Sequence, residues 1–332
     1  MKKIPNIVCL GGGTGTFVVL RGLKSFPCKL SAIVAMSDSG GANKRIRDEF
    51  GLLPVSDLRQ CLVALSDENG GAGLLRKLFM YRFEKGKGIS GMTFGNLFMA
   101  ALSDILGSQE EAIRQTGKVL RIHGTVIPVS YTKTNLFAQY EDGSILNEEH
   151  LIDEPSHDGT LKIEKLFLKP KAKANPEAIE KIRTADLIVL GPGDLFTRIL
   201  PNLLVLKIAK EIKNSKAKLI YIMNLMTKFG QTYNFKASNH LKILENYLGK
   251  RINYVIVNNG SVNKKALSIY AKYQEYPVVD DLSAKSYYKI IRNDVAAKNI
   301  VYKSASDSLV RSLIRHDSVK LGSVLISLSW KI

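Results

Sequence analysis

The chain of 332 residues lacks the features that mark several large classes of protein. It contains no run of eighteen apolar residues, so the sequence predicts no membrane-spanning helix. Its three cysteines, Cys9, Cys28 and Cys61, are widely spaced, with neither a CxxC pair nor a Cys/His cluster of zinc spacing. A zinc site and a disulfide framework are therefore not expected, and a cytoplasmic location is the default expectation.

Signatures of hydrolytic catalysis and of nucleic-acid binding are also missing. The five histidines form no pattern that pairs them with a serine or cysteine nucleophile, and no G-x-S-x-G elbow occurs. The net charge is +18, but there is no helix-turn-helix or aromatic RNA-binding pattern. Because the lysines are spread along the chain, the charge favours a solvated basic surface over a nucleic-acid interface. It also suits an anionic ligand such as a nucleotide.

Apolar runs bounded by glycine alternate with segments of helical periodicity through most of the chain. Strands are predicted over 4–10, 30–36, 185–194, 218–226 and 253–260. Helices are predicted over 16–26, much of 55–120, 175–184, 201–214 and 237–248. Repeated strand–helix–strand units indicate an α/β fold with a Rossmann-like, doubly wound, mainly parallel sheet.

The pattern changes between residues 124 and 169, where the sequence alternates as strands do. Glu141-Asp142-Gly143 predicts a hairpin turn within this segment. We therefore interpret residues 1–332 as one domain, with a Rossmann-like core over 1–123 and 170–332 and a small β-rich insertion over about 124–169. The sequence leaves the oligomeric state open, a homo-oligomer included.

Glycines, hydroxyls and amides follow the predicted strands, where ligands of such sheets bind. The candidate nucleotide-binding residues at these strand ends are Gly11, Gly12, Gly13, Thr14, Gly15, Ser39, Gly40, Gly41, Asn43, Arg45, Gly191, Gly193 and Asn224, with Asn96 before a later helix. Agreement among several strand ends predicts a nucleotide cleft at one edge of the sheet.

The loop LGGGTG after the first strand fits neither the dinucleotide fingerprint nor the Walker motif. Its glycines nevertheless permit close approach of an anion, and the next helix directs free N–H groups toward it. A phosphate or diphosphate site is one interpretation, and a tight turn without a ligand is the other.

Asp38 and Asp57 are the candidate catalytic and metal-binding residues, because two carboxylates with substrate phosphates suit Mg²⁺. Alternatively, Ser56 or Asp57 caps a helix. Lys44, Arg45 and Arg47 form either a phosphate-binding group or a solvated helix start. The residues thus indicate a nucleotide or sugar-nucleotide binder or a metal-assisted transferase, and Asp38 on a ribose would suit NAD binding as a third hypothesis.

Several segments together resemble one family. They are VCLGGGTGTFVVLRGLK, AIVAMSDSGGANKRIR, GLLPVSDLRQCLVALS, SGMTFGNLFMAAL, ADLIVLGPGDLFTRILPNLLV and LIRHDSVKLGSVL. In this order and spacing the chain resembles the gluconeogenesis factor (YvcK-type) branch of the 2-phospho-L-lactate transferase (CofD-type) superfamily.

The resemblance implies a cytoplasmic binder of UDP-sugars such as UDP-N-acetylglucosamine, which links carbon metabolism to cell-wall synthesis and cell shape. The alternative that it implies is a Mg²⁺-dependent transferase, which moves phospholactate from a nucleotide-activated donor to a deazaflavin. By motif position, Asp38 and Asp57 match the family's acids, and Tyr270 and Arg315 match residues linked to the UDP-sugar. The branch usually shows two acids before the glycine pair, whereas Ser37-Asp38-Ser39 supplies one here, which favours a binder.

Overall fold

The computed structural model describes residues 3–68, 70–154, 156–284, 286–300 and 312–330. Within these ranges no helix combines the length and the apolar character needed to cross a membrane.

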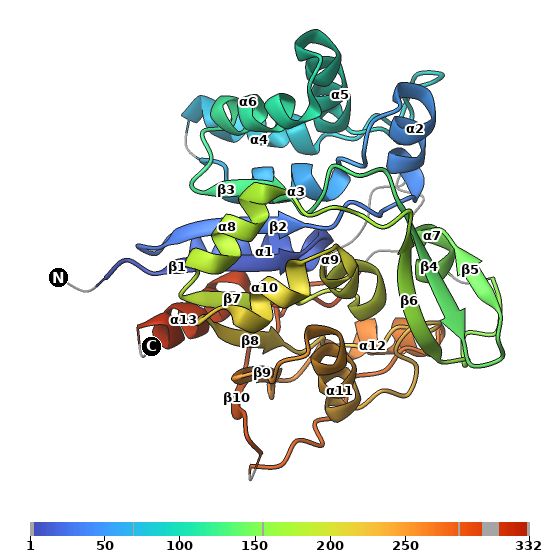
Figure 1. Ribbon diagram of the computed structural model, residues 1–332, viewed down its shortest axis with the longest axis vertical. Coiled ribbons are helices and arrows are strands. Elements are labelled where there is room, and N and C mark those ends of the chain that lie inside the picture. Colours follow the sequence, from blue (N-terminus) through green and yellow to red (C-terminus); the bar gives the residue numbers. More distant parts are fainter. Residues whose placement is uncertain (1–2, 69, 155, 285, 301–311, 331–332) are drawn as a thin grey trace.

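A seven-stranded sheet forms the centre of the molecule (Figure 1). Its strands are β1 Asn6–Gly11, β2 Lys29–Val34, β3 Thr125–Pro128, β7 Leu187–Leu190, β8 Lys218–Ile222, β9 Tyr254–Asn258 and β10 Lys289–Asn293. The order is β10-β9-β8-β7-β1-β2-β3, and all neighbours pair in parallel. The predicted α/β fold with a mainly parallel, doubly wound sheet is confirmed.

The direction in which strands are added reverses at β1. The chain proceeds from β1 to β2 and β3 on one side, and later from β7 to β10 on the other. A crevice for ligands is expected outside the carboxyl ends of β1 and β7, because the crossovers leave in opposite directions there.

A second, three-stranded antiparallel sheet lies beside the carboxyl ends of the large sheet (Figure 1). It consists of β4 Asn135–Tyr140, β5 Ile145–Asn147 and β6 Ile163–Lys169, with α7 Glu149–Asp153 between β5 and β6. The predicted hairpin at Glu141-Asp142-Gly143 joins β4 to β5. The first strand of the predicted β-rich segment, β3, instead belongs to the large sheet, where it pairs with β2.

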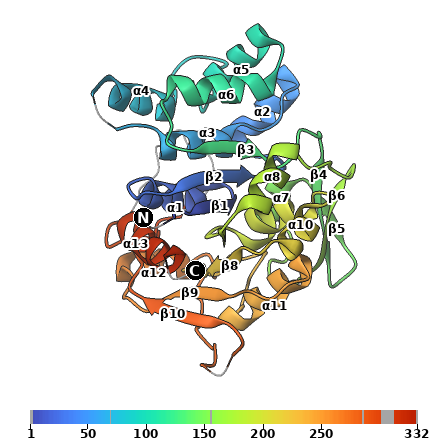
Figure 2. The same ribbon diagram turned by 60° about the vertical axis from the view of Figure 1, so that its left-hand side comes forward.

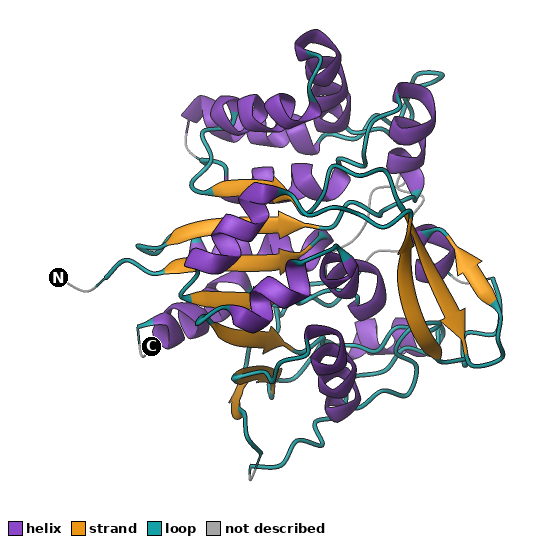
Figure 3. Cartoon of the chain, viewed as in Figure 1, coloured by secondary structure: helices purple, strands orange, loops and turns teal. Residues whose placement is uncertain are grey.

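Helices cover both faces of the large sheet, as Figures 2 and 3 show. One face carries α1 Gly13–Leu23, α3 Ser56–Leu65 and α13 Ser318–Ser329. The other carries α8 Pro176–Thr184, α9 Leu200–Leu204, α10 Ile208–Asn214 and α11 Ala237–Leu248. The helix α12 Lys264–Ala271 follows β9 and lies beyond the carboxyl ends of the strands (Figure 1). The helices α2 Gly41–Phe50, α4 Gly70–Met80, α5 Phe94–Leu106 and α6 Gln109–Val119 lie beyond the β3 edge (Figure 1).

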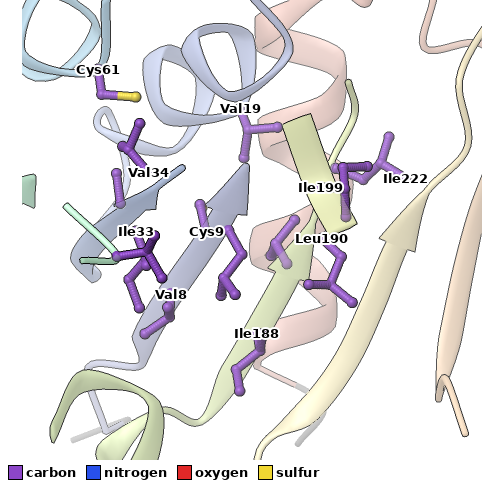
Figure 4. Close-up of a cluster of buried hydrophobic side chains, with 14 of the residues drawn as sticks. Val8, Cys9, Val19, Ile33, Val34, Cys61, Ile188, Leu190, Ile199 and Ile222 are labelled. Atoms are coloured by element: carbon purple, nitrogen blue, oxygen red, sulfur yellow. The ribbon is translucent and has the colours of Figure 1, made fainter. Parts of the chain in front are cut away.

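The core lies between the sheet and these helices (Figure 4). Val8, Cys9 and Ile188 are almost fully buried, as two-sided coverage of a parallel sheet requires. Cys9 and Cys61 are buried thiols, and burial raises the pKa of both well above the usual value.

Two glycines allow α1 and α13 to cross closely. A Cβ added at Gly22 would lie 2.0 Å from the carbonyl oxygen of Ser318, and one at Gly322 would lie 2.5 Å from the carbonyl oxygen of Gly22. Backbone meets backbone at this crossing, so a side chain at either position has no flexible neighbour that could move aside.

The helix predicted over 201–214 is interrupted. A π-helical segment, η1 Leu195–Ile199, leads into α9, and α10 begins only at Ile208. Between α9 and α10, Leu206 donates its N–H to the carbonyl of Ala172 at 3.0 Å and bridges Lys173, and Lys207 adopts φ of 75°. Pairing with a distant segment has overridden the local helical periodicity.

Candidate functional site

A cavity of about 370 Å³ lies at the carboxyl ends of β1, β2, β7 and β8, where the strand order reverses. Loops that follow these four strands line it together with α3, α5, α12 and the segment after residue 311. Among the described residues, six cationic side chains and five carboxylates face it: Arg45, Arg59, Arg82, Arg198, Lys228, Arg315, Asp38, Asp57, Asp153, Asp194 and Glu275.

The glycine loop and the start of α1 form one wall of the cavity. The helix begins at Gly13, earlier than the predicted Thr16, and Gly12, Gly13, Thr14 and Gly15 line the cavity. Gly13 has φ of 62°, a conformation that favours glycine. The free N–H groups of the first turn of α1 therefore lie at the cavity, where an anion would be stabilised.

Most glycines of this loop are required by packing within the protein. A Cβ added at Gly12 would lie 2.2 Å from Asp57 Oδ2, and one at Gly15 would lie 2.0 Å from the carbonyl oxygen of Pro192. A Cβ at Gly11 would lie 2.5 Å from Thr16 Oγ1. The excess of glycine over the needs of a simple turn thus has an internal cause and does not by itself indicate a ligand.

Arg198, which the sequence analysis did not single out, lies between the two predicted acids. Its Nη1 is 2.8 Å from Asp38 Oδ2 and 3.3 Å from Asp57 Oδ2, and its Nη2 is 3.3 Å from Glu149 Oε1. The side chains are 15%, 8%, 7% and 1% exposed for Arg198, Asp38, Asp57 and Glu149. Four ionisable groups from four separate parts of the chain form one buried cluster.

The electrostatics of the cluster follow from burial and from the shared cation. Burial alone would raise the pKa of Asp38, but the Arg198 guanidinium and the Gly40 N–H, 3.0 Å from Asp38 Oδ1, hold it below its usual value. Burial raises the pKa of Glu149 well above the ordinary range. Burial lowers the pKa of Arg198, but Glu149, Asp57 and Asp38 more than compensate, so the guanidinium stays charged.

Asparagine side chains hold the wall formed by α3 and α5. Asn43 Oδ1 accepts hydrogen bonds from the N–H groups of Val55 and Ser56, both at 3.1 Å. The predicted capping of α3 by Ser56 or Asp57 is wrong, because both are helical residues and Asn43 satisfies the helix start from outside.

Asn96 fixes the other side of this wall. Its Oδ1 accepts from Arg59 Nε at 2.9 Å, and its Nδ2 donates to Ser56 Oγ at 3.0 Å. The segment around Asn96 is both a capped helix start, with Thr93 as N-cap, and part of the cavity lining. Asn96 thus positions the Arg59 guanidinium at the cavity.

A second group of charged side chains lines the cavity close enough to the Arg198 cluster to interact with it electrostatically. Lys228 Nζ is 3.8 Å from Glu275 Oε1, and Asp153 and Asp194 are close enough to raise the pKa of Lys228, although burial opposes this. Burial raises the pKa of Glu275 to about 7. The side chain of His316 is 8% exposed and also lines the cavity, and its Nε2 has no hydrogen-bond partner among the described residues.

Tyr270 and Arg315 also line the cavity. Tyr270, on α12, is 9% exposed, and its hydroxyl accepts hydrogen bonds from the N–H groups of Leu313 at 3.0 Å and Ile314 at 3.4 Å. The hydroxyl thereby fixes the segment that carries Arg315 along the cavity.

The structure brings most of the predicted site residues together. Those that line the cavity are Gly12, Gly13, Thr14, Gly15, Asp38, Gly40, Gly41, Asn43, Arg45, Asp57, Asn96, Gly193, Asn224, Tyr270 and Arg315. Three others, Gly11, Ser39 and Gly191, are not part of the lining. Gly11 ends β1, where its carbonyl accepts from Ala35, and Ser39 Oγ accepts from the N–H of His150 at 3.1 Å.

Gly191 follows β7 directly and donates to the carbonyl of Leu10, so it belongs to the sheet end behind the lining. Of the three predicted phosphate-binding cations on α2, only Arg45 reaches the cavity, whereas Lys44 and Arg47 lie outside it. Arg45 pairs with Glu49 at 3.2 Å and donates to the carbonyls of Gly88 and Ser90.

The arrangement does not fit the Mg²⁺ site predicted from Asp38 and Asp57. Mg²⁺ requires about six oxygen ligands at about 2.0–2.1 Å, but Nη1 of Arg198 occupies the space that faces both carboxylates. Within the described ranges, no group of three or more His, Cys, Asp or Glu side chains is arranged to hold a metal ion.

The groups that sequence reasoning missed are Arg198, Glu149 and Lys228. Arg198 lies only five positions after Gly193 in the turn that follows β7, and this closeness to a strand end could have marked it as a candidate site residue. No sequence pattern marks Glu149, because the fold of the small sheet is what brings it close to Asp38 and Ser39.

The fold and the cavity together define a class of protein. This is a Rossmann-like α/β protein with an anion-compatible cleft at the point where the strand order reverses, lined by a helix N-terminus and by paired charges.

Comparison with known proteins assigns the family. Residues 7–297 match the family model described as 2-phospho-L-lactate transferase CofD, and the chain belongs to that family. It is 37% identical over 333 residues to the gluconeogenesis factor of Bacillus subtilis, covering 99% of both chains. It is 42% identical over 283 residues to the gluconeogenesis factor of Halalkalibacterium halodurans, covering 85% of each.

A crystal structure of a protein from Bacillus halodurans has the same fold. It matches with a TM-score of 0.87 and 36% sequence identity, covering 98% of this chain and all of that one. The resemblance inferred from the sequence motifs is therefore confirmed at the level of the family and of the relatives named gluconeogenesis factor.

Proposed function

We propose that this protein is a cytoplasmic gluconeogenesis factor that binds a sugar nucleotide of the UDP-N-acetylglucosamine kind. In this proposal, ligand binding reports on carbon metabolism and regulates cell-wall synthesis and cell shape. The proposal is supported by the names of the relatives that match over nearly the whole chain. The chain belongs to the CofD family, and polar and charged groups from several elements line its cavity.

One observation carries the proposal: a helix N-terminus and several cations converge on one cavity at the reversal of strand order. The first turn of α1 and the side chains of Arg59 on α3 and Arg198 on η1 all line the cavity. A diphosphate fits such a site, because N–H groups and bidentate guanidinium groups both bind phosphate oxygens. Tyr270 and Arg315, which line the same cavity, are then available to the rest of the ligand.

The same geometry favours a binder over the other two hypotheses. A Mg²⁺-dependent transferase requires Asp38 and Asp57 as free metal ligands, whereas both accept charge-assisted contacts from Arg198. NAD binding requires Asp38 to accept ribose hydroxyls, but its two oxygens already accept from Gly40 and Arg198. No contact among the described residues of the cavity favours the transferase or the NAD-binding hypothesis over a sugar-nucleotide binder.

The test is a thermal-shift panel with UDP-N-acetylglucosamine, UDP-glucose, UDP, GDP and NAD on the purified protein. A ligand present at about 100 times its Kd stabilises the native state by about 2.7 kcal/mol, which corresponds to a rise in Tm of several degrees. We expect this rise with UDP-N-acetylglucosamine and expect Arg315→Ala to diminish it. No rise at millimolar concentration, or a rise with GDP or NAD alone, would contradict the proposal.

A second readout separates a binder from an enzyme. The protein is incubated with UDP-N-acetylglucosamine, with and without Mg²⁺, and the nucleotide is analysed by phosphorus NMR. Recovery of the intact ligand together with a rise in Tm is expected of a regulator. Conversion of the nucleotide in step with protein concentration would instead establish turnover.

A further inference from the structure

Arg198 holds the position that a divalent cation would need in order to bridge the two predicted acids. One nitrogen, Nη1, contacts both Asp38 Oδ2 at 2.8 Å and Asp57 Oδ2 at 3.3 Å. A guanidinium supplies positive charge and directional donors to these oxygens, which is the electrostatic part of the role of a bound metal ion. Two carboxylates at the edge of an anion site would otherwise repel the ligand.

The position of Arg198 is fixed by packing as well as by charge. It lies in the π-helical segment η1, and such segments recur at functional sites. A Cβ added at Gly193 would lie 3.5 Å from Arg198 Cβ, and one at Gly13 would lie 3.9 Å from Arg198 Nε. The stem of the side chain thus packs at the turn after β7, and its Nε lies beside the first turn of α1.

Glu149 locks the guanidinium from the side of the small sheet. Its Oε1 is 3.3 Å from Arg198 Nη2, and its Oε2 accepts from the N–H of Ser39 at 3.4 Å. Glu149 is 1% exposed, so displacement of Arg198 by a metal ion would leave a carboxyl group buried without its cationic partner. A buried polar group left without its hydrogen-bonding partner is unfavourable, and this opposes exchange of Arg198 for a metal ion.

We infer that Arg198 is a built-in cation that replaces a divalent metal ion between Asp38 and Asp57, so that this site binds a diphosphate-containing ligand without metal. The statement that a diphosphate ligand binds here rests on the proposed function. The statement that Arg198 takes the place of a metal ion does not. Arg198 neutralises the two acids and presents its Nε beside the first turn of α1, where the diphosphate lies. The ligand class is therefore a nucleoside diphosphate or its sugar ester in metal-free form.

The first experiment measures metal binding in the absence of any nucleotide. Mn²⁺ is titrated into the wild-type protein, and free Mn²⁺ is followed by electron paramagnetic resonance. We expect the signal of free Mn²⁺ to be the same with and without protein. Stoichiometric loss of that signal, abolished by Asp57→Asn, would overturn the inference whatever the nucleotide does.

The second experiment measures nucleotide affinity by calorimetry with UDP-N-acetylglucosamine, in EDTA and in millimolar Mg²⁺. For the wild type we expect the two Kd values to agree within about twofold. For Arg198→Ser we expect affinity in EDTA to fall by about tenfold or more and to be largely restored by Mg²⁺, since a metal ion can then bind the freed carboxylates. Arg198→Lys keeps the charge but not the several donors of the guanidinium, so its affinity in EDTA is expected to lie between those of the wild type and Arg198→Ser, with little gain from Mg²⁺.

Arg45→Ser is the matched control, because Arg45 lines the same cavity but contacts neither acid. Its effect on affinity is expected to be equal in EDTA and in Mg²⁺. Wild-type affinity that depends on Mg²⁺, an Arg198→Ser variant that binds as tightly as the wild type in EDTA, or a loss that Mg²⁺ does not restore would each overturn the inference. If the wild type binds no nucleotide but also no Mn²⁺, the proposed function fails while the metal-replacing role of Arg198 stands.

Discussion

Replacing Tyr270 by phenylalanine tests whether this residue acts through the segment that carries Arg315. The hydroxyl of Tyr270 accepts hydrogen bonds from Leu313 N at 3.0 Å and Ile314 N at 3.4 Å, and it is the only atom that the substitution removes. The ring stays, so packing around α12 should be preserved. The two N–H groups, in contrast, lose their acceptor in a partly buried position.

The expected magnitude follows from that loss. A buried donor left without a partner costs about 1–3 kcal/mol, and here the shorter bond carries most of it. If this free energy is what holds Arg315 at the cavity, the affinity for the nucleotide falls by roughly tenfold for every 1.4 kcal/mol. We therefore expect Tyr270→Phe to weaken binding by about tenfold in calorimetry with UDP-N-acetylglucosamine.

The control and a double mutant separate positioning from direct contact. Tyr273→Phe alters a tyrosine just beyond the same helix that is 57% exposed, and it should leave the affinity unchanged. In a double-mutant cycle with Arg315→Ala, adding Tyr270→Phe should cost much less than it does in the wild type. Unchanged affinity in Tyr270→Phe would refute the reasoning, and strictly additive losses would show that the hydroxyl touches the ligand itself.

Three further predictions concern stability, each measured by urea unfolding. Gly22→Ala should destabilise the fold by about 1–3 kcal/mol, because its Cβ would meet backbone where α1 crosses α13. By contrast Gly71→Ala, a helical site with nothing within 4 Å of the added Cβ, should be neutral or stabilising. Asn43→Ala should cost about 2 kcal/mol, because two N–H groups at the start of α3 lose their acceptor, and retention of wild-type stability would contradict this. Burial lowers the pKa of His240 to about 4, so the native state excludes a proton that the unfolded chain binds below about pH 6.5. This group alone should lower stability by about 2 kcal/mol between pH 7 and pH 5, and His316, whose pKa burial also lowers to about 4, should contribute a similar amount. His240→Gln should therefore make the change in stability over this range smaller by about 2 kcal/mol than in the wild type, and an unchanged pH dependence would contradict this.

Local sequence patterns were sufficient to predict the sheet and the edge at which the cavity lies. The strands around Val8 and Ile188 are short apolar runs ended by glycine, and their carboxyl ends necessarily meet at one side of a parallel sheet. The helix over 201–214 was predicted too simply, because its interruption depends on the contact of Leu206 with Ala172. A contact between segments about thirty residues apart leaves no trace in helical periodicity.

The chemistry of the site was harder to predict than its location. Asp38 and Asp57 were identified as a pair, but their partner Arg198 lies 160 and 141 positions away in the sequence. Two acids near glycines suggest Mg²⁺ when nothing else is known, since Mg²⁺ is usually bound by one or two carboxylates together with substrate phosphates. The contact of Arg198 with both acids, which suggests the alternative proposed above, becomes visible only in the three-dimensional structure.

The conformation of the glycine loop and the geometry of the Arg198 cluster depend on each other. Gly12 has no side chain, which lets the Asp57 carboxylate approach the loop so closely that a Cβ would lie 2.2 Å from its Oδ2. Asp57 in that position contacts Arg198, which in turn contacts Glu149 on α7 beside the small sheet. A substitution at Gly12 should therefore disturb the charge cluster before it touches any ligand. The loop that first indicated an anion site is in this way also the structural support of the cation beside it.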